Sequence, residues 1–132
     1  MSPTGRTLVA LRRSGYLADV VERWVPHANL RQDLFGFADI IAIRAGEPGA
    51  LLIQTTTAAN LASRRQKAQR APALRTWLAT GNRFELWGWS QRNGRWEAKR
   101  EALTLPDLAA VVVELKPPRR RRSEPGLFDA MI

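Results

Sequence analysis

The sequence contains no cysteine and only one histidine, His27. Without cysteine there are no disulfide bonds or thiolate metal ligands, which excludes the disulfide-rich secreted scaffolds. A single histidine excludes a histidine-rich zinc site and leaves a Ser-His catalytic triad dependent on His27 alone. The chain has no apolar run near the ~20 residues that span a membrane, and its N-terminal apolar run is too short for a secretion signal. We therefore expect a cytoplasmic protein that does not contact membranes.

What the sequence has in excess is positive charge. Its 21 lysines and arginines outnumber 12 acidic residues, which gives a formal net charge of +9. The segment 117–132 carries four arginines against two acids, so residues 1–116 retain +7. A strongly basic domain indicates a polyanionic partner, most often nucleic acid. The alternative is that the charge only reflects an arginine-rich proteome.

Hydrophobic periodicity and turn residues divide the chain into helices and strands. They predict, in order, a helix over 7–13, strands over 16–24, 36–44 and 50–57, a basic helix over 61–70 that Pro72 interrupts and extends to 80, strands over 83–91 and 95–103, and a helix over 106–115. Asn93-Gly94 joins the last two strands, and Asn-Gly is the strongest short hairpin signal. The prediction is one α/β domain over residues 1–116 with a mixed sheet flanked by helices. We expect 117–132 to be a basic, disordered tail.

One acidic residue, Asp39, lies inside the apolar stretch 35–43, which is otherwise typical of a buried strand. A buried carboxylate needs hydrogen-bond donors or a cation, because leaving it unpaired costs several kcal/mol. On the next strand, Gln54 and Thr56 share one face. One interpretation is structural: Asp39 accepts hydrogen bonds from Arg31, Gln54 or a backbone turn. The other is that Asp39 and Gln54 hold Mg²⁺ or Mn²⁺ against a phosphodiester.

The predicted helix that follows these strands is cationic. The strands over 36–44 and 50–57 are predicted to form a hairpin across a turn rich in glycine and proline, and Asn60 is the candidate N-cap of the helix. Together with Arg31, which precedes this hairpin, the helix supplies candidate phosphate contacts, namely Arg31, Arg64, Arg65, Lys67, Arg70 and Arg75. A solvated helix face is an equal alternative to a phosphate-binding surface. The chain also has five tryptophans. Most should pack in the core or across strands, although an exposed pair would suit stacking on unpaired bases.

This layout resembles the PD-(D/E)XK nuclease superfamily, which has the restriction-endonuclease-like fold with an αβββαβ core. Small Holliday-junction resolvases and VRR-NUC domains are the most similar members. The resemblance covers about residues 5–90 and depends on short motifs. The matching residues are Gly36 with Asp39-Ile40-Ile41-Ala42, the strand Leu52 to Thr56, the helix from Asn60, and an ending formed by Trp77, Leu78 and Gly81.

The resemblance implies a metal-dependent DNA endonuclease, structure-selective like a resolvase and acting as a homodimer. Its metal, Mg²⁺ or Mn²⁺, would be held by Asp39 and Gln54, with Asp33 and Glu22 as further candidate ligands. The arginine bias and small size suggest a phage or mobile-element source.

The chain departs from the family pattern in its catalytic residues. The family lysine, two positions after the acid, falls on Thr56, and the acid itself is replaced by Gln54. The family's first-helix glutamate is missing, and Glu22 is the candidate to replace it. Lys67 is the candidate to replace the lysine by reaching in from the helix. Two other hypotheses stay open: a catalytically degenerate nuclease fold that only binds nucleic acid, and a protein-interaction subunit.

The C-terminal segment holds one further motif. Leu127-Phe128, after a basic linker, resembles the short peptides with which replication and repair proteins bind the bacterial sliding clamp. The leading glutamine of such peptides is replaced by Glu124. The alternative is an apolar C-terminus that folds back on the domain.

Overall fold

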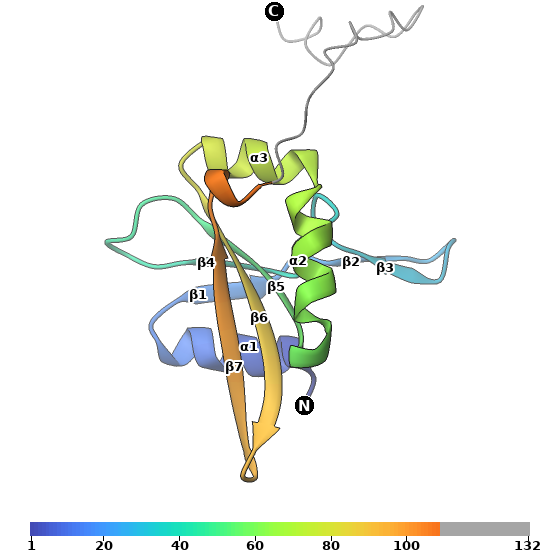
Figure 1. Cartoon of the computed structure of the whole chain (residues 1–132), viewed down its shortest axis with the longest axis vertical. Helices are drawn as coiled ribbons and strands as arrows, with labels where there is room; N and C mark the ends of the chain where they lie inside the picture. Colours follow the sequence, from blue (N-terminus) through green and yellow to red (C-terminus); the bar gives the residue numbers. More distant parts are fainter. Residues whose placement is uncertain (109–132) are drawn as a thin grey trace, which may run out of the picture.

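A five-stranded mixed sheet forms the centre of the molecule (Figure 1). The structure, a computed structural model, describes residues 1–108. The strand order is β1 (Leu17–Val20), β4 (Ile40–Ile43), β5 (Leu51–Thr57), β6 (Arg83–Arg92) and β7 (Arg95–Leu103). The pair β5–β6 is parallel and the other pairs are antiparallel. The predicted α/β class with a mixed sheet is confirmed.

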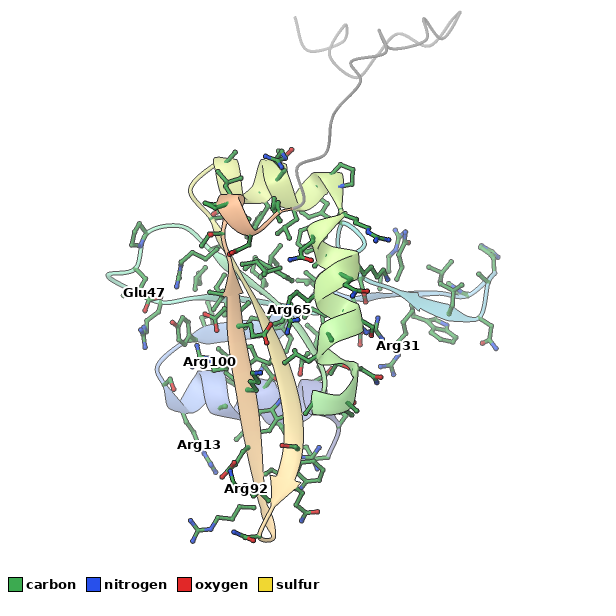
Figure 2. All side chains as sticks on the ribbon, viewed as in Figure 1. Arg13, Arg31, Glu47, Arg65, Arg92 and Arg100 are labelled. Atoms are coloured by element: carbon green, nitrogen blue, oxygen red, sulfur yellow. The ribbon has the colours of Figure 1, made fainter. Side chains whose placement is uncertain are left out.

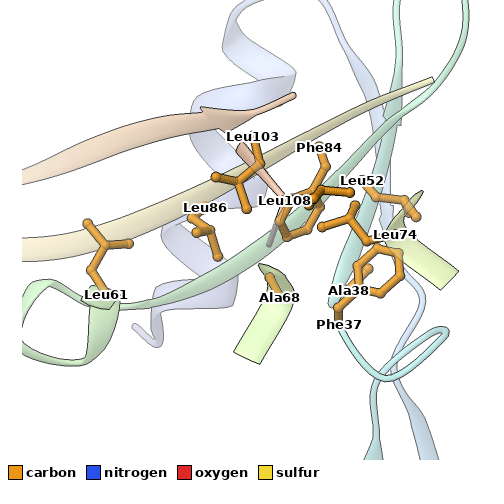
Figure 3. Packing of buried hydrophobic residues seen from close by; sticks show 10 residues of the cluster. All are labelled: Phe37, Ala38, Leu52, Leu61, Ala68, Leu74, Phe84, Leu86, Leu103 and Leu108. Carbon is orange, nitrogen blue, oxygen red and sulfur yellow. The ribbon is translucent and has the colours of Figure 1, made fainter. Parts of the chain in front are cut away.

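Helices cover both faces of this sheet. On one face α1 (Pro3–Arg13) buries Leu11 against apolar residues of β4, β5 and β6. On the other face lie α2 (Leu61–Gln69) and α3 (Pro72–Ala79), whose buried leucines join the cluster in Figure 3. Successive residues of β5 alternate between the two clusters, since side chains alternate along a strand. Leu52 therefore packs under α2 and α3, and Ile53 packs toward α1. None of the described helices is long and apolar enough to cross a membrane.

Helix α1 starts earlier than predicted, whereas α2 starts at the predicted residue, Leu61, without the expected cap. Helix α1 begins at Pro3 rather than residue 7, because the Ser2 hydroxyl accepts a hydrogen bond from the Gly5 N–H at 3.1 Å and proline suits the first helical position. The chain enters α2 through a short 3₁₀ helix, η1 (Ala58–Asn60). Asn60, expected to cap α2, makes no side-chain capping bond because its backbone is already helical (φ −97°, ψ 0°). A cap residue needs an extended backbone.

The strand predicted over 16–24 is wrong. It divides into β1 and β2 (Arg23–Val25), and β2 pairs only with β3 (Leu30–Gln32), which lies in the segment expected to be a connector. Val20 pairs with Ile40, the first residue of β4. Beyond Val20 there is no further strand to pair with, because the chain before Asp39 forms a turn bridged from Leu34 to Ala38. The β2–β3 hairpin projects sideways from the main sheet (Figure 1).

Both predicted hairpins, which lie in the main sheet, are confirmed. Strands β4 and β5 pair across a glycine-containing turn, and β6 and β7 pair across Asn93-Gly94. Asn93 and Gly94 both have positive φ, 51° and 75°, as a tight two-residue hairpin turn requires. After β7 the chain forms a short 3₁₀ helix, η2 (Leu105–Asp107). The rest of the predicted last helix, the tail 117–132 and the Leu127-Phe128 motif lie outside the described residues.

A buried hydrogen-bond network connects α1 to the sheet. The Thr7 hydroxyl lies 2.8 Å from Oγ1 of Thr55 on β5, and it accepts a bond of 2.9 Å from Nε1 of Trp89 on β6. It also lies 2.9 Å from the carbonyl of Pro3, to which it donates. Since Thr7 is fully buried, every partner in this network depends on it.

We expect Thr7→Val to lower the free energy of unfolding by about 2 kcal/mol, because it leaves the buried indole N–H of Trp89 without an acceptor. Urea denaturation measures the change. Thr4→Val, the same substitution in the same helix at a position outside the network, is the matched control and should change stability by less than about 0.5 kcal/mol. Equal losses for the two variants would contradict the role of the network.

Candidate metal site

Three carboxylates meet where the β2–β3 hairpin joins the main sheet. Glu22 precedes β2, Asp33 follows β3, and Asp39 precedes β4. Arg23 pairs with Gln32 in the hairpin, so the two residues just outside that pair are brought together. One oxygen from each carboxylate lies within 4.8 Å of the others. The sequence placed all three as candidate ligands, and the structure brings them to one point.

The backbone of the sheet holds Asp39 in place. Its side chain is buried, and Oδ2 accepts a hydrogen bond of 2.9 Å from the backbone N–H of Thr55 on β5. Its own N–H donates to the carbonyl of Ile53 at 2.9 Å. A backbone donor thus accounts for one oxygen of Asp39, but it lies in a strand and not in the turn that the structural interpretation supposed. Neither suggested side-chain donor bonds Asp39: Arg31 pairs with Glu22 at 3.1 Å, and Gln54 donates to Asp33.

The environment of Asp39 favours its neutral form. The pKa of the Asp39 carboxyl is raised from 3.8 to about 7, foremost because burial disfavours the charged form. A hydrogen bond with Asp33 and the negative charges of Asp33 and Glu22 raise it further, while the Thr55 N–H acts in the opposite direction. A cation at this point would offset the repulsion, and it would favour the ionised form of Asp39.

Gln54 contributes a buried amide to the same site. It is 2% exposed, and its Nε2 donates to Asp33 Oδ2 at 3.1 Å. Its Oε1 is buried and has no hydrogen-bond partner among residues 1–108. Rotating the amide by half a turn exchanges the two atoms, which are assigned from the hydrogen-bond network. It would then present Oε1 beside the Asp33 carboxylate, and such an all-oxygen donor set fits Mg²⁺ or Mn²⁺.

Strand β5 carries no lysine or arginine beside these ligands. Thr56, two residues after Gln54, is buried on the same face of the strand. Lys67, proposed to replace the missing lysine, is exposed, and its ammonium group forms no hydrogen bond or ion pair with any residue in the described part of the chain. The structure therefore gives Lys67 no contact with Asp39, and its catalytic role stays a prediction.

The orientation of α2 separates its basic residues into two groups. Leu61 and Ala68 face the core. Arg65 lies on the β7 side of the helix, where Nε and Nη2 each donate to Glu101 at 2.6 Å. At 100° per residue, Arg64 and Lys67 fall on the opposite flank, toward β5 and β4. Figure 2 shows Arg65 and Arg31 on opposite sides of α2.

The six candidate phosphate-binding residues accordingly differ in position. Arg31 forms an ion pair with Glu22, and Arg65 forms one with Glu101. The remaining four lie on or after α2, namely Arg64, Lys67, Arg70 and Arg75. Sequence reasoning missed that Glu101 engages Arg65, because the order of strands in the sheet decides this. It gave no special place to Arg64, although three-residue spacing from Lys67 on a helix was a usable signal.

Comparison with models of known protein families, with curated proteins and with solved structures finds no match to this chain. A functional assignment therefore depends on the geometry of the chain itself and on the short motifs of its sequence.

Proposed function

We propose that this chain is a metal-dependent DNA endonuclease whose cation is held by Asp39, Asp33, Glu22 and Gln54. The observation that carries the proposal is the convergence of three carboxylates on a buried amide whose Oε1 has no partner within the described residues. A buried polar atom without a partner is rare and asks for a ligand. The basic surface of the chain suits a polyanionic substrate.

The order of elements also supports the proposal. Leaving out the β2–β3 hairpin, the main sheet is reached through α1, then β1, β4 and β5, then α2 and α3, then β6. This is the αβββαβ order that the resemblance to PD-(D/E)XK nucleases implies. Asp39 and Gln54 stand on its second and third strands or directly beside them, as that resemblance also implies.

The residues around the cluster have different roles in phosphodiester hydrolysis. When bound, Mg²⁺ or Mn²⁺ would polarise a phosphate oxygen and acidify a water molecule. The Thr55 N–H orients Asp39. The Gln54 amide donates to Asp33 in the metal-free site, and it would turn its Oε1 toward a bound cation. Arg64 and Lys67, on the adjacent flank of α2, hold the phosphates of the strand to be cut.

Cleavage assays test the proposal directly. The wild type, incubated with branched, flapped and linear DNA in Mg²⁺ or Mn²⁺, should cut at least one of them. Asp39→Asn should lower the rate by about 100-fold or more, because it removes a metal ligand. Asp19→Asn, the same change at an exposed position on β1, should leave the rate unaltered. Absence of cutting, or cutting that persists in Asp39→Asn, would overturn the proposal.

A second candidate function is nucleic-acid binding without cleavage. It is favoured by Thr56, which puts a buried hydroxyl where the family has a lysine. Salt-dependent DNA binding without metal-dependent cutting would establish this function. Absence of DNA binding at any salt concentration would instead favour a protein-interaction subunit. The homodimer and the sliding-clamp contact stay predictions.

The two flanks of α2 should differ in their effect on DNA binding. We expect Arg64→Ala and Lys67→Ala each to reduce the slope of log affinity against log salt by about one, because each loses one phosphate contact. Arg65→Ala should leave the slope unchanged, since its guanidinium is occupied by Glu101. Fluorescence anisotropy across a salt series measures all three. If the slope fell only for Arg65→Ala, the phosphates would lie on the Arg65 flank of α2, which would contradict the proposed phosphate contacts.

A further inference from the structure

Within residues 1–108, no helix or second sheet packs against the β2–β3 hairpin, defined here as residues 23–32, in a way that would explain its composition. It forms a separate two-stranded sheet that extends away from the body of the molecule (Figure 1). Two of its large apolar side chains, Trp24 and Leu30, are 52% and 48% exposed. An isolated two-stranded hairpin is marginally stable in water. A binding partner that covers the exposed tryptophan would explain why the chain has such an element.

The charge of the hairpin indicates the chemistry of that contact. Its ten residues include Arg23, Arg31 and His27 and no acidic residue. Trp24 stands directly opposite Arg31 across the two strands, and both are exposed. Stacking surfaces interleaved with arginines suit unpaired nucleic acid, in which bases lie open and phosphates carry charge. A second copy of the same hairpin would meet it with like charge, which disfavours self-association here.

The base of the hairpin leads into the acidic cluster. Glu22 and Asp33 stand at its two ends. A cavity of about 280 Å³ opens there and has Asp33 in its wall. Its other lining residues are Val21, Arg23, Gln32, Leu34 and Phe35. A strand of nucleic acid that lies along the hairpin would therefore reach the proposed cation site without crossing another element.

We infer that the β2–β3 hairpin is the substrate-recognition arm of this protein and that it selects DNA in which an unpaired stretch adjoins a duplex. Trp24 stacks on an open base, and Arg23 and Arg31 hold the adjacent phosphates. Arg31 has donors left for this contact, because it bonds Glu22 through Nη1 alone and its side chain is 71% exposed, whereas Arg65 bonds Glu101 through two nitrogens. This inference rests on the proposed function, because it assigns a substrate class to the same site. It also gives a structural reason for the two carboxylates at the ends of the arm: they are positioned by the element that holds the substrate.

The test compares two exposed tryptophans. Fluorescence anisotropy in EDTA, where no cleavage occurs, gives the affinity of the full chain for a flapped duplex and for a fully paired duplex of equal length. Trp24→Ala should weaken binding to the flapped DNA by about tenfold, and binding to the paired duplex by less than about twofold. Trp24→Phe should recover most of the affinity. Trp96→Ala, which removes a tryptophan 47% exposed at the far hairpin, should change neither affinity.

Each remaining outcome decides a different point. Equal losses on both DNAs, or a loss only in Trp96→Ala, would overturn the recognition arm and leave the proposed function standing. Absence of DNA binding by the wild type would overturn the proposed function itself. Should Trp24→Ala also lower the melting temperature, the comparison of Arg31→Gln on the two DNAs decides, with a larger loss expected on the flapped DNA. If Trp24→Ala changed the protein from dimer to monomer in sedimentation without changing its affinity for DNA, the arm would be a self-association surface and the inference would be overturned.

Discussion

Asp39→Asn should raise the free energy of unfolding of the metal-free protein by about 2 kcal/mol near pH 8. The pKa of Asp39 is raised from 3.8 to about 7 in the folded chain, so at this pH the carboxyl is ionised although it is buried. Asparagine removes the charge and keeps an oxygen that can accept the Thr55 N–H. Its amide can also donate to Asp33. The substitution therefore relieves an electrostatic cost that the folded state bears.

The pH dependence follows from the direction of the shift. Between 3.8 and about 7 the folded protein retains a proton on Asp39 that the unfolded chain has lost. Stability contributed by this group therefore falls as pH rises through that interval, and the cost is complete above the folded pKa. The variant should lack this fall. Its advantage over the wild type should accordingly be small near pH 4 and reach its full size near pH 8.

Thermal denaturation in EDTA at several pH values measures this effect. An increase of about 2 kcal/mol corresponds to about 10 °C in melting temperature for a domain of this size. Asp19→Asn is the control for removal of an acidic charge at an exposed site, and it should shift the melting temperature by only a few degrees. An Asp39→Asn protein less stable than the wild type near pH 8 would show that the carboxylate is already compensated.

Divalent cations should reverse the order of the two proteins. A ligand that binds only the folded state stabilises it in proportion to the logarithm of its concentration over the dissociation constant. Mg²⁺ or Mn²⁺ should therefore raise the melting temperature of the wild type and leave that of Asp39→Asn almost unchanged. The cation should also release protons near neutral pH, because it favours the ionised form of Asp39, whose pKa is raised to about 7.

Gly49→Ala should lower the free energy of unfolding by about 3 kcal/mol. Gly49 has φ +75°, a backbone conformation that disfavours a side chain. A Cβ at this position would also lie 2.5 Å from the carbonyl oxygen of Gly81, which is closer than such atoms approach. The contact joins the β4–β5 turn to the turn before β6, so relieving it shifts one of the central strands.

Gly46→Ala is the matched control in the same turn. Gly46 has φ +87°, and a Cβ at this position would have no atom within 4 Å, so only the backbone cost of about 1 kcal/mol applies. Urea denaturation of both variants separates the close contact from the backbone conformation. Equal destabilisation by the two substitutions would show that the turns move apart without cost.

The sequence was most informative where local chemistry decides structure. Asn93-Gly94 and the glycines after β4 indicated both hairpins of the main sheet, because those turns need positive φ. Asp39 was found because a lone carboxylate in an apolar strand is costly. The face shared by Gln54 and Thr56 followed from the two-residue period of a strand.

The failures arose where distant parts of the chain decide. The residue pattern over 16–24 is the same for one long strand and for a strand that ends after Val20. Only the turn before Asp39 ends the strand there. Pro26 and Asn29 mark the hairpin turn that was overlooked, and Asn29 has φ 50°. The pairing of Arg65 with Glu101 requires knowing that β7 lies beside β6.

The parallel pairing of β5 with β6 also has a consequence for how the molecule folds. Strands β6 and β7 can form from neighbouring residues, whereas β5 meets β6 only after the chain has passed through α2 and α3 and closed a long loop. Such non-local pairing is slow relative to hairpin formation. Since β5 supplies the Thr55 N–H that holds Asp39, we expect the acidic cluster to be completed late in folding. Cation binding would then report on the finished sheet rather than on its parts.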